Sequence, residues 1–259
     1  MTVRQDTRPD AVDSPGSPRR RRPSLLAVVA LVASVALAGA LVTLIVDRRH
    51  AATPVATALR PTGIPANVAT DVANLMALSP VPSKAAPGFV LTDQSGATLP
   101  LSSFRGKVVV LEAMDPHCVD ICPLVSREFI DAYHDLGAAA SHVVFAAINV
   151  NQYFSSVADV HKFSADNGLT GLPDWHFFTG PTPALQAAWA AYGVQVVAPD
   201  PKADILHTSI VYFIDPSGLE RYVASPMVDH TASGSSYLPP AVITSWGQGI
   251  ATTARDLVP

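Results

Sequence analysis

The longest apolar stretch of the chain runs from Ser24 to Val46 and contains no charged residue. As a helix, a segment of this length covers about 35 Å, which is enough to cross the hydrocarbon core of a bilayer. The apolar region of a cleaved signal peptide is usually only about 7–15 residues long. The pattern therefore favours a transmembrane anchor over residues 24–46, with a cleaved signal peptide as the alternative.

A block of four arginines, Arg19 to Arg22, precedes this apolar stretch. Basic residues beside a membrane span tend to stay in the cytoplasm, so we expect residues 1–23 to form a cytoplasmic tail. Arg48 and Arg49 weaken the contrast across the span without reversing it. The predicted location is the cell membrane, with a single pass, a cytoplasmic N-terminus and an extracytoplasmic C-terminal domain.

Residues 47–84 are rich in proline, alanine and threonine, which is typical of a stiffened linker. Within this segment, residues 67–78 show only weak helical spacing of apolar positions, and we interpret them as part of the linker. The pattern changes near residue 85, where short apolar runs begin to alternate with helical spacing. We therefore expect one folded domain over residues 85–259.

This domain has the pattern of an α/β fold. Predicted elements are a hairpin over 89–101, strands at 107–114, 142–150, 175–178, 209–214 and 220–224, and helices at 122–136, 157–167, 183–192 and 240–256. Alternating strands and helices, followed by a hairpin and a last helix, predict a mixed α/β sheet with helices on both faces.

The charges divide unevenly along the chain. Beyond residue 50 there are nine basic and seventeen acidic side chains, a net charge near −8. An acidic exported domain argues against a nucleic-acid partner, because phosphate binding needs clustered Lys and Arg. The sequence also contains no phosphate-binding glycine loop, no His-Glu-x-x-His and no Gly-x-Ser-x-Gly. Hydrolase and nucleotide-dependent functions therefore have little support.

Cys118 and Cys122 are the only cysteines, and they lie between the predicted strand 107–114 and the body of the next helix. A cysteine at a helix start lies beside unpaired backbone N–H groups and the positive end of the helix dipole, which favours the thiolate. A disulfide closing so small a loop would stabilise the fold little. The pair is therefore a candidate for metal binding, for redox chemistry or, less readily, for a structural disulfide.

Three segments together are similar to a known family. They are Ala86-Pro-Gly-Phe-Val-Leu-Thr-Asp, the run Leu101 to Leu111 followed by Cys-x-x-x-Cys-Pro, and Leu206-His-Thr-Ser-Ile-Val-Tyr-Phe-Ile-Asp-Pro-Ser-Gly. Over about residues 85 to 255 the chain resembles the Sco/SenC family of thioredoxin-like copper-binding proteins. Ordinary thioredoxins have two residues between their cysteines, whereas this family has three. The resemblance implies a thioredoxin-like fold.

The chain departs from the family pattern near the cysteines. Val119 occupies a position where proline is usual, and the family's Gly-Tyr-Thr-like approach to the first cysteine is replaced by residues 112–117. Residues 149–154 replace the family's Asp-Pro-x-Arg-Asp-Thr stretch. We interpret the chain as a divergent member, whose docking surface departs from the family more than its ligands do.

The resemblance implies that Cys118, Cys122 and His207 bind copper, as Cu(I), Cu(II) or both. Thiolates favour Cu(I), a mixed thiolate and imidazole set also accepts Cu(II), and zinc is chemically possible. Metal binding requires reduced sulfurs, so the redox state of the pair would control loading. The implied function is a membrane-anchored extracytoplasmic copper metallochaperone that supports assembly of the copper site of a cytochrome c oxidase.

The implied partners are a copper-accepting oxidase subunit or another exported cuproprotein, together with an extracytoplasmic thiol reductant. The main alternative is an enzyme, a membrane-tethered thiol-disulfide oxidoreductase in which Cys118 attacks and Cys122 resolves. A peroxide-reducing thioredoxin-like enzyme has weaker support. His117, next to Cys118, is either a loop residue, which we favour, or an auxiliary ligand or promoter of the thiolate.

Overall fold

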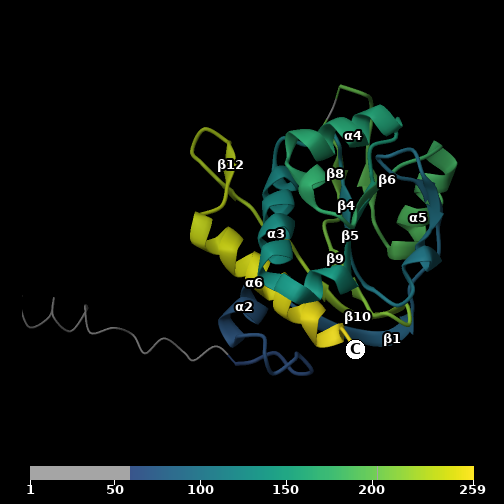
Figure 1. Ribbon diagram of the computed structural model, residues 1–259. Helices are drawn as coiled ribbons and strands as arrows, with labels where there is room; N and C mark the ends of the chain where they lie inside the picture. Colours follow the sequence, from purple (N-terminus) through teal and green to yellow (C-terminus); the bar gives the residue numbers. More distant parts are fainter. Residues whose placement is uncertain (1–58, 203) are drawn as a thin grey trace, which may run out of the picture. The chain divides into compact units, whose positions relative to one another are not determined.

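A six-stranded mixed sheet with the order β1-β10-β9-β4-β5-β6 forms the centre of the computed structural model, which describes residues 59–202 and 204–259 (Figure 1). Parallel strands pair at one side of the sheet, and these are β4 (Val108–Met114), β5 (Val143–Asn149) and β6 (Trp175–Phe178). Antiparallel strands complete the other side, and these are β9 (Val211–Ile214), β10 (Leu219–Ala224) and β1 (Ser79–Ala85).

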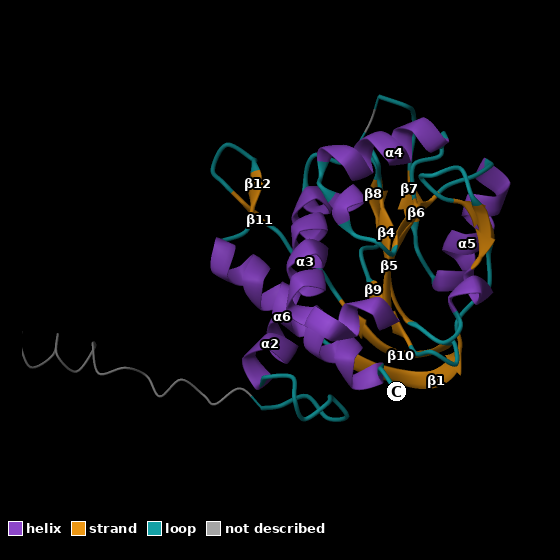
Figure 2. Cartoon of the chain, viewed as in Figure 1, coloured by secondary structure: helices purple, strands orange, loops and turns teal. Residues whose placement is uncertain are grey.

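Helices cover both faces of this sheet, as predicted (Figure 2). One face packs against α2 (Thr70–Leu75), α3 (Ile121–Leu136), α4 (Val157–Asp166) and α6 (Pro240–Leu257). The other face packs against α5 (Thr182–Tyr192) and the hairpin of β2 (Val90–Thr92) and β3 (Thr98–Pro100). The central strands β4 and β5 are buried on both faces, which explains their nearly continuous apolar sequences.

Every strand and helix predicted between residues 107 and 256 is present, with ends that differ by no more than two residues. The smaller elements were not predicted. They are the 3₁₀ turns η1 (Leu101–Phe104), η2 (Gly137–His142) and η3 (Leu169–Gly171), and the strand pairs β7 (Val196–Val197) with β8 (Leu206–His207) and β11 (Asp229–His230) with β12 (Ser236–Tyr237). Strands of two residues are too short to produce a hydrophobic period.

Part of the segment predicted as a linker belongs to the folded unit. Helix α2 packs against α6, where Gly249 lies directly against Met76 and Val72. A side chain at Gly249 would collide with Met76, so the missing Cβ is what permits this close contact. Strand β1 is an edge strand, a position that tolerates Pro80 and Pro82 because their missing N–H groups are not all needed for pairing.

The predicted cytoplasmic tail 1–23, the predicted anchor 24–46 and the first part of the predicted linker lie outside the described residues. Among the helices between residues 59 and 259 that the structure describes, none combines the length and the apolar character needed to cross a membrane.

Candidate metal and thiol site

The loop that follows β4 carries Cys118 and is organised by one aspartate. Asp115 accepts a hydrogen bond from the backbone N–H of His117 at 2.8 Å through Oδ1, and its carbonyl accepts one from the N–H of Cys118 at 3.1 Å. The side-chain amide of Asn151 donates to the same Oδ1 at 2.9 Å. Asp115 and Asn151 therefore fix the loop at the carboxyl end of the parallel strands.

The two cysteines meet at the start of α3, which begins at Ile121. Cys118 precedes the helix and Cys122 lies in its first turn, where its backbone N–H donates to Cys118 Sγ at 3.4 Å. The sulfur of Cys118 thus accepts one of the N–H groups that a helix start leaves unpaired, as its position in the sequence predicted. Both cysteines are free thiols.

The two thiols have opposite acidities. A hydrogen bond from the Cys122 side chain lowers the pKa of Cys118 to about 7, and two backbone N–H groups add to this effect. The same hydrogen bond, together with burial, raises the pKa of Cys122 well above its ordinary value. At pH 7 about half of the chains therefore carry a thiolate at Cys118, while Cys122 stays protonated.

His207 lies at the end of β8 and is half-buried. Its Nδ1 is 3.0 Å from the carbonyl oxygen of Thr208. A carbonyl can only accept, so Nδ1 carries the hydrogen and Nε2 keeps a free lone pair. Burial lowers the pKa of His207, which keeps the imidazole neutral at pH 7. Neutral imidazole is the form that binds metal.

One cavity of about 820 Å³ connects these groups, since both Cys118 and His207 line it. The predicted ligands are nevertheless not assembled into a cluster. In the part of the chain that the structure describes, no three His, Cys, Asp or Glu side chains lie close enough together to hold a metal ion. The cysteines contact each other, whereas His207 lies elsewhere on the wall of the cavity.

His207 precedes the strand predicted at 209–214 and lies outside the six-stranded sheet. The central strand β9 starts only at Val211, and His207 instead pairs with Val196 of β7. Because β9 runs antiparallel to β4, its first residues lie near the end of β4, where the cysteine loop begins. This topology brings the chain before Val211 to the cysteine cavity.

His117 lies at the rim of the same cavity. Its ring stacks on Phe154, with 3.5 Å between ring centroids and 17° between planes. Its Nε2 lies 3.8 Å from the carboxylate of Asp159. These contacts hold the imidazole beside Cys118 without bringing it into a ligand cluster.

The end of β5 and the segment that follows it supply site residues that were not predicted from the sequence. Asn149 is fully buried, accepts the N–H of Asn151 and donates to the carbonyl of Phe154. Asn151, Tyr153 and Phe154 line the cysteine cavity. An asparagine at the end of a buried parallel strand and another two residues later indicate this role, because functional groups gather at the carboxyl ends of such strands.

Two buried carboxyl groups lie between β4 and α3. Glu112 alternates along β4 with Val110 and Met114, which pack in the same core cluster as Cys122. Its Oε1 accepts a hydrogen bond from Ser209 at 2.7 Å, and its Oε2 has no hydrogen-bond partner among the described residues. Burial raises the pKa of Glu112 to about 8 and that of Glu128 to about 9. Both are therefore neutral acids at pH 7.

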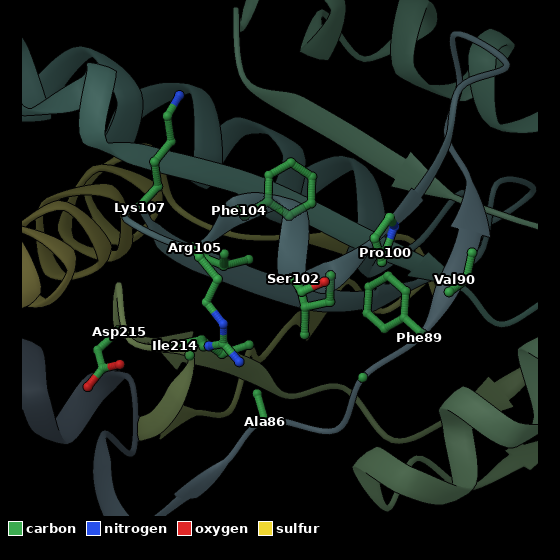
Figure 3. Close-up of a pocket in the computed structure, with 14 residues that line it drawn as sticks. Ala86, Phe89, Val90, Pro100, Ser102, Phe104, Arg105, Lys107, Ile214 and Asp215 are labelled. Carbon is green, nitrogen blue, oxygen red and sulfur yellow. The ribbon is translucent and has the colours of Figure 1, made fainter.

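A second cavity, of about 400 Å³, lies near the start of β4 and is drawn in Figure 3. Among the described residues that line it there is no cysteine or histidine. The two cationic side chains that line it already have partners within the chain. Arg105 donates a hydrogen bond to the carbonyl of Ser217 at 2.5 Å, and the Lys107 ammonium lies 2.8 Å from the Asp174 carboxylate. The candidate site is therefore the cavity at the cysteines.

A family model and several solved structures are similar to this chain. Residues 79–231 match the family model described as SCO1/SenC. The structure is similar to the copper-bound ScoI of Bradyrhizobium japonicum, with a TM-score of 0.52 and 19% identity over 67% of this chain and 99% of that one. It is equally similar to the copper-bound ScoI of Arabidopsis thaliana, with a TM-score of 0.51 and 18% identity over 67% and 99%.

A third structure, BsSco, is described as a member of the Sco family of cytochrome c oxidase assembly proteins. It has a TM-score of 0.45 and 22% identity over 56% of this chain and 84% of that one. A comparison with curated protein sequences gave no match. At these identities the structural likenesses bear on the fold alone.

Proposed function

This chain belongs to the SCO1/SenC family, and from that premise we propose that it is a membrane-anchored, extracytoplasmic copper metallochaperone. Copper is its cargo, which it binds through Cys118, Cys122 and His207 and delivers to an exported acceptor. The copper site of a cytochrome c oxidase subunit is the acceptor that we propose, in line with the description of BsSco as a member of a family of oxidase assembly proteins.

The observation that carries the proposal is the donor set around one cavity. Cys118 supplies a thiolate near neutral pH, and His207 supplies a neutral imidazole with Nε2 free. Soft thiolate ligands select Cu(I), and imidazole also suits copper. Two structures with the same fold, the ScoI proteins of B. japonicum and A. thaliana, contain copper. The residues present therefore fit this cargo.

Loading the site requires two changes in this chain. Cys122 must release the proton that it shares with Cys118, because a metal binds the thiolate form of cysteine. His207 must approach the cysteine pair across the cavity, since the three side chains are not clustered in the described residues. We propose that β8 and the turn after it make this movement when copper binds.

The redox state of the pair controls loading in this proposal. The two thiols lose two protons and two electrons when they form a disulfide, and the sulfurs are then no longer available to the ion. An extracytoplasmic thiol reductant returns these electrons and protons and restores the site. The membrane anchor at residues 24–46 remains a proposal from the sequence, with the N-terminus cytoplasmic and the C-terminal domain outside.

An anaerobic Cu(I) titration of the reduced full-length chain against a Cu(I) chelator tests the function. We expect one copper per chain, loss of tight binding in Cys118→Ser, and binding at least about tenfold weaker in His207→Ala, because each change removes a ligand. His161→Ala is the matched control, since His161 is exposed on α4. Stoichiometric tight binding that survives Cys118→Ser would falsify the site.

A second candidate function is thiol-disulfide exchange, which the Cys118 pKa of about 7 favours. The Cys118 thiolate would attack a partner disulfide and release one partner thiolate. Cys122 would then lose its proton, attack Cys118 Sγ, and release the second partner thiol. Assays of His207→Ala separate the candidates, because the variant loses tight copper binding in the first and keeps disulfide reduction in the second.

A further inference from the structure

Exposed apolar side chains gather around the cysteine cavity. Among the described residues, eight large apolar side chains are exposed, and six of them form what we name the apolar rim: Val119, Tyr153, Val197, Leu206, Met227 and Tyr237. Val119 is 93% exposed and Leu206 67% exposed. The other two of these eight exposed apolar residues, Leu59 and Val90, lie outside this group.

Each member of the apolar rim lines the cavity or is a chain or cross-strand neighbour of a residue that does. Val119, Tyr153 and Leu206 line it directly. Val197 is the cross-strand partner of Leu206, while Met227 and Tyr237 are chain neighbours of lining residues. In Figure 2 the short strands β7, β8, β11 and β12 all lie toward the upper end of the molecule. Single exposed apolar residues are ordinary, but a group around one cavity indicates an interaction site.

The cavity inside the apolar rim is acidic. Asp115, Asp120 and Asp204 line it, and Lys202 is the one lysine or arginine among the described residues that do so. Asp229 on β11 adds an exposed carboxylate close to the lining residue Val228. A partner that docks here must therefore bring positive charge as well as apolar contact.

We propose that the apolar rim and its acidic cavity are the docking surface for the copper acceptor, and that the acceptor presents an apolar segment flanked by Lys or Arg. This inference rests on the proposed chaperone function and adds the chemistry of its partner. A second copy of this chain fits the surface poorly, because a symmetric contact would bring the same carboxylates together.

Binding of two synthetic peptides to the reduced full-length chain tests this proposal. Both peptides contain the same run of leucines, and the flanking residues are lysine in one and glutamate in the other. In biolayer interferometry at low ionic strength we expect the lysine peptide to bind at least about tenfold more tightly. The difference should shrink when salt is raised to about 0.5 M, because salt screens exposed charges.

Two variants and a matched control locate the contact. Leu206→Ser and Met227→Ser should weaken binding of the lysine peptide several-fold, because both remove apolar contact from the rim. Val90→Ser makes the same kind of change at a residue that is 62% exposed on β2, away from this cavity, and should leave binding unchanged. Equal binding of the two peptides, or equal loss in Val90→Ser and Leu206→Ser, would overturn the docking surface.

Two further measurements separate the possible failures. Sedimentation of the wild-type chain should show no dimer that depends on the apolar rim. A dimer that Leu206→Ser abolishes would mean that the rim binds a second copy of this chain, and would overturn the proposal. Cu(I) titration of the same wild-type sample reports on the proposed function. If the chain binds copper but binds the two peptides equally, the proposed docking surface is wrong and the chaperone function stands. If the chain does not bind copper, the chaperone function is wrong, and with it the premise that a copper acceptor docks here.

Discussion

At the scale of single residues, Cys118 and Cys122 show how position makes two identical side chains different. Cys118 lies just before α3 and accepts hydrogen bonds from the helix start, whereas Cys122 is buried and donates one. The charge therefore resides on the more accessible sulfur. In the two functions proposed above, this asymmetry makes Cys118 the first ligand or the attacking thiolate, and Cys122 the second ligand or the resolving thiol.

Replacing Cys122 tests the origin of the Cys118 acidity. Cys122→Ala removes the side-chain donor and should raise the pKa of Cys118 toward its ordinary value. The thiolate fraction at pH 7 then falls by about tenfold, and alkylation of Cys118 by iodoacetamide slows accordingly. The pH profile of the alkylation rate measures the shift.

Cys122→Ser is the control for this measurement, because its hydroxyl group keeps a donor at the same place. We expect the pH profile of its alkylation rate to lie between the profiles of Cys122→Ala and the reduced wild-type chain. An unchanged profile in Cys122→Ala would show that the backbone N–H groups and the helix start alone determine the Cys118 pKa.

At the scale of elements, the starts of two helices contact residues that line the cavity. The start of α3 has no side-chain cap from Asp120, and Cys118 Sγ accepts a backbone N–H there instead. The start of α4 has a capping box between Ser156 and Asp159. Asp159 also lies 3.8 Å from His117 at the rim of the cavity. Helix termini thus contact both His117 and Cys118 of the loop after β4.

Removing the cap of α4 should destabilise the chain without touching the cysteines. In Ser156→Ala the N–H of Asp159 loses the acceptor that lies 3.2 Å away, at a cost of about 1 kcal/mol. For a folded unit of this size we expect the melting temperature to fall by about 2–4 °C. Thermal unfolding followed by circular dichroism measures the shift.

Ser156→Gly is the matched variant, since glycine at this position costs only a few tenths of a kcal/mol relative to serine. The order of stability should therefore be serine, glycine, alanine. If alanine and glycine destabilised the chain equally, the capping box would not be the reason for the loss.

At the scale of the whole molecule, the buried acids make stability depend on pH. The pKa values of Glu112 and Glu128, raised by burial to about 8 and about 9, keep both groups protonated in the folded chain, whereas both ionise near pH 4.5 when unfolded. Their stabilising effect is complete below the unfolded pKa and is lost as pH rises through the folded pKa. Between pH 5 and 7 each group should lower stability by roughly 1 kcal/mol per pH unit.

Glu128→Gln should make this dependence shallower, because the amide is neutral in both states. The measurement is the melting temperature of wild type and variant at pH 5, 6 and 7, where the difference in slope isolates the contribution of Glu128. Asp135→Asn, which changes an exposed carboxylate on the same helix, should leave the slope of the wild type unchanged. Equal slopes for wild type and Glu128→Gln would contradict the raised pKa of Glu128 in the folded chain.

The sequence by itself determined the central strands, the long helices and the cysteine pair. Each of these depends on local chemistry: a hydrophobic period, a helix start, or two sulfurs four residues apart in the chain. The ends of β4 and α3 followed from the apolar run before Cys118 and the helical spacing after Cys122. Local interactions suffice for such features, so they can be read from one segment at a time.

Only the tertiary structure decided where distant segments meet. It made α2 and β1 parts of the fold through contacts with α6 and β10, although their own sequences resemble a linker. It placed His207 in a short strand pair on the wall of the cavity and buried Glu112 inside an apolar strand. These outcomes depend on packing between residues far apart in the chain, for which a single sequence carries no local pattern.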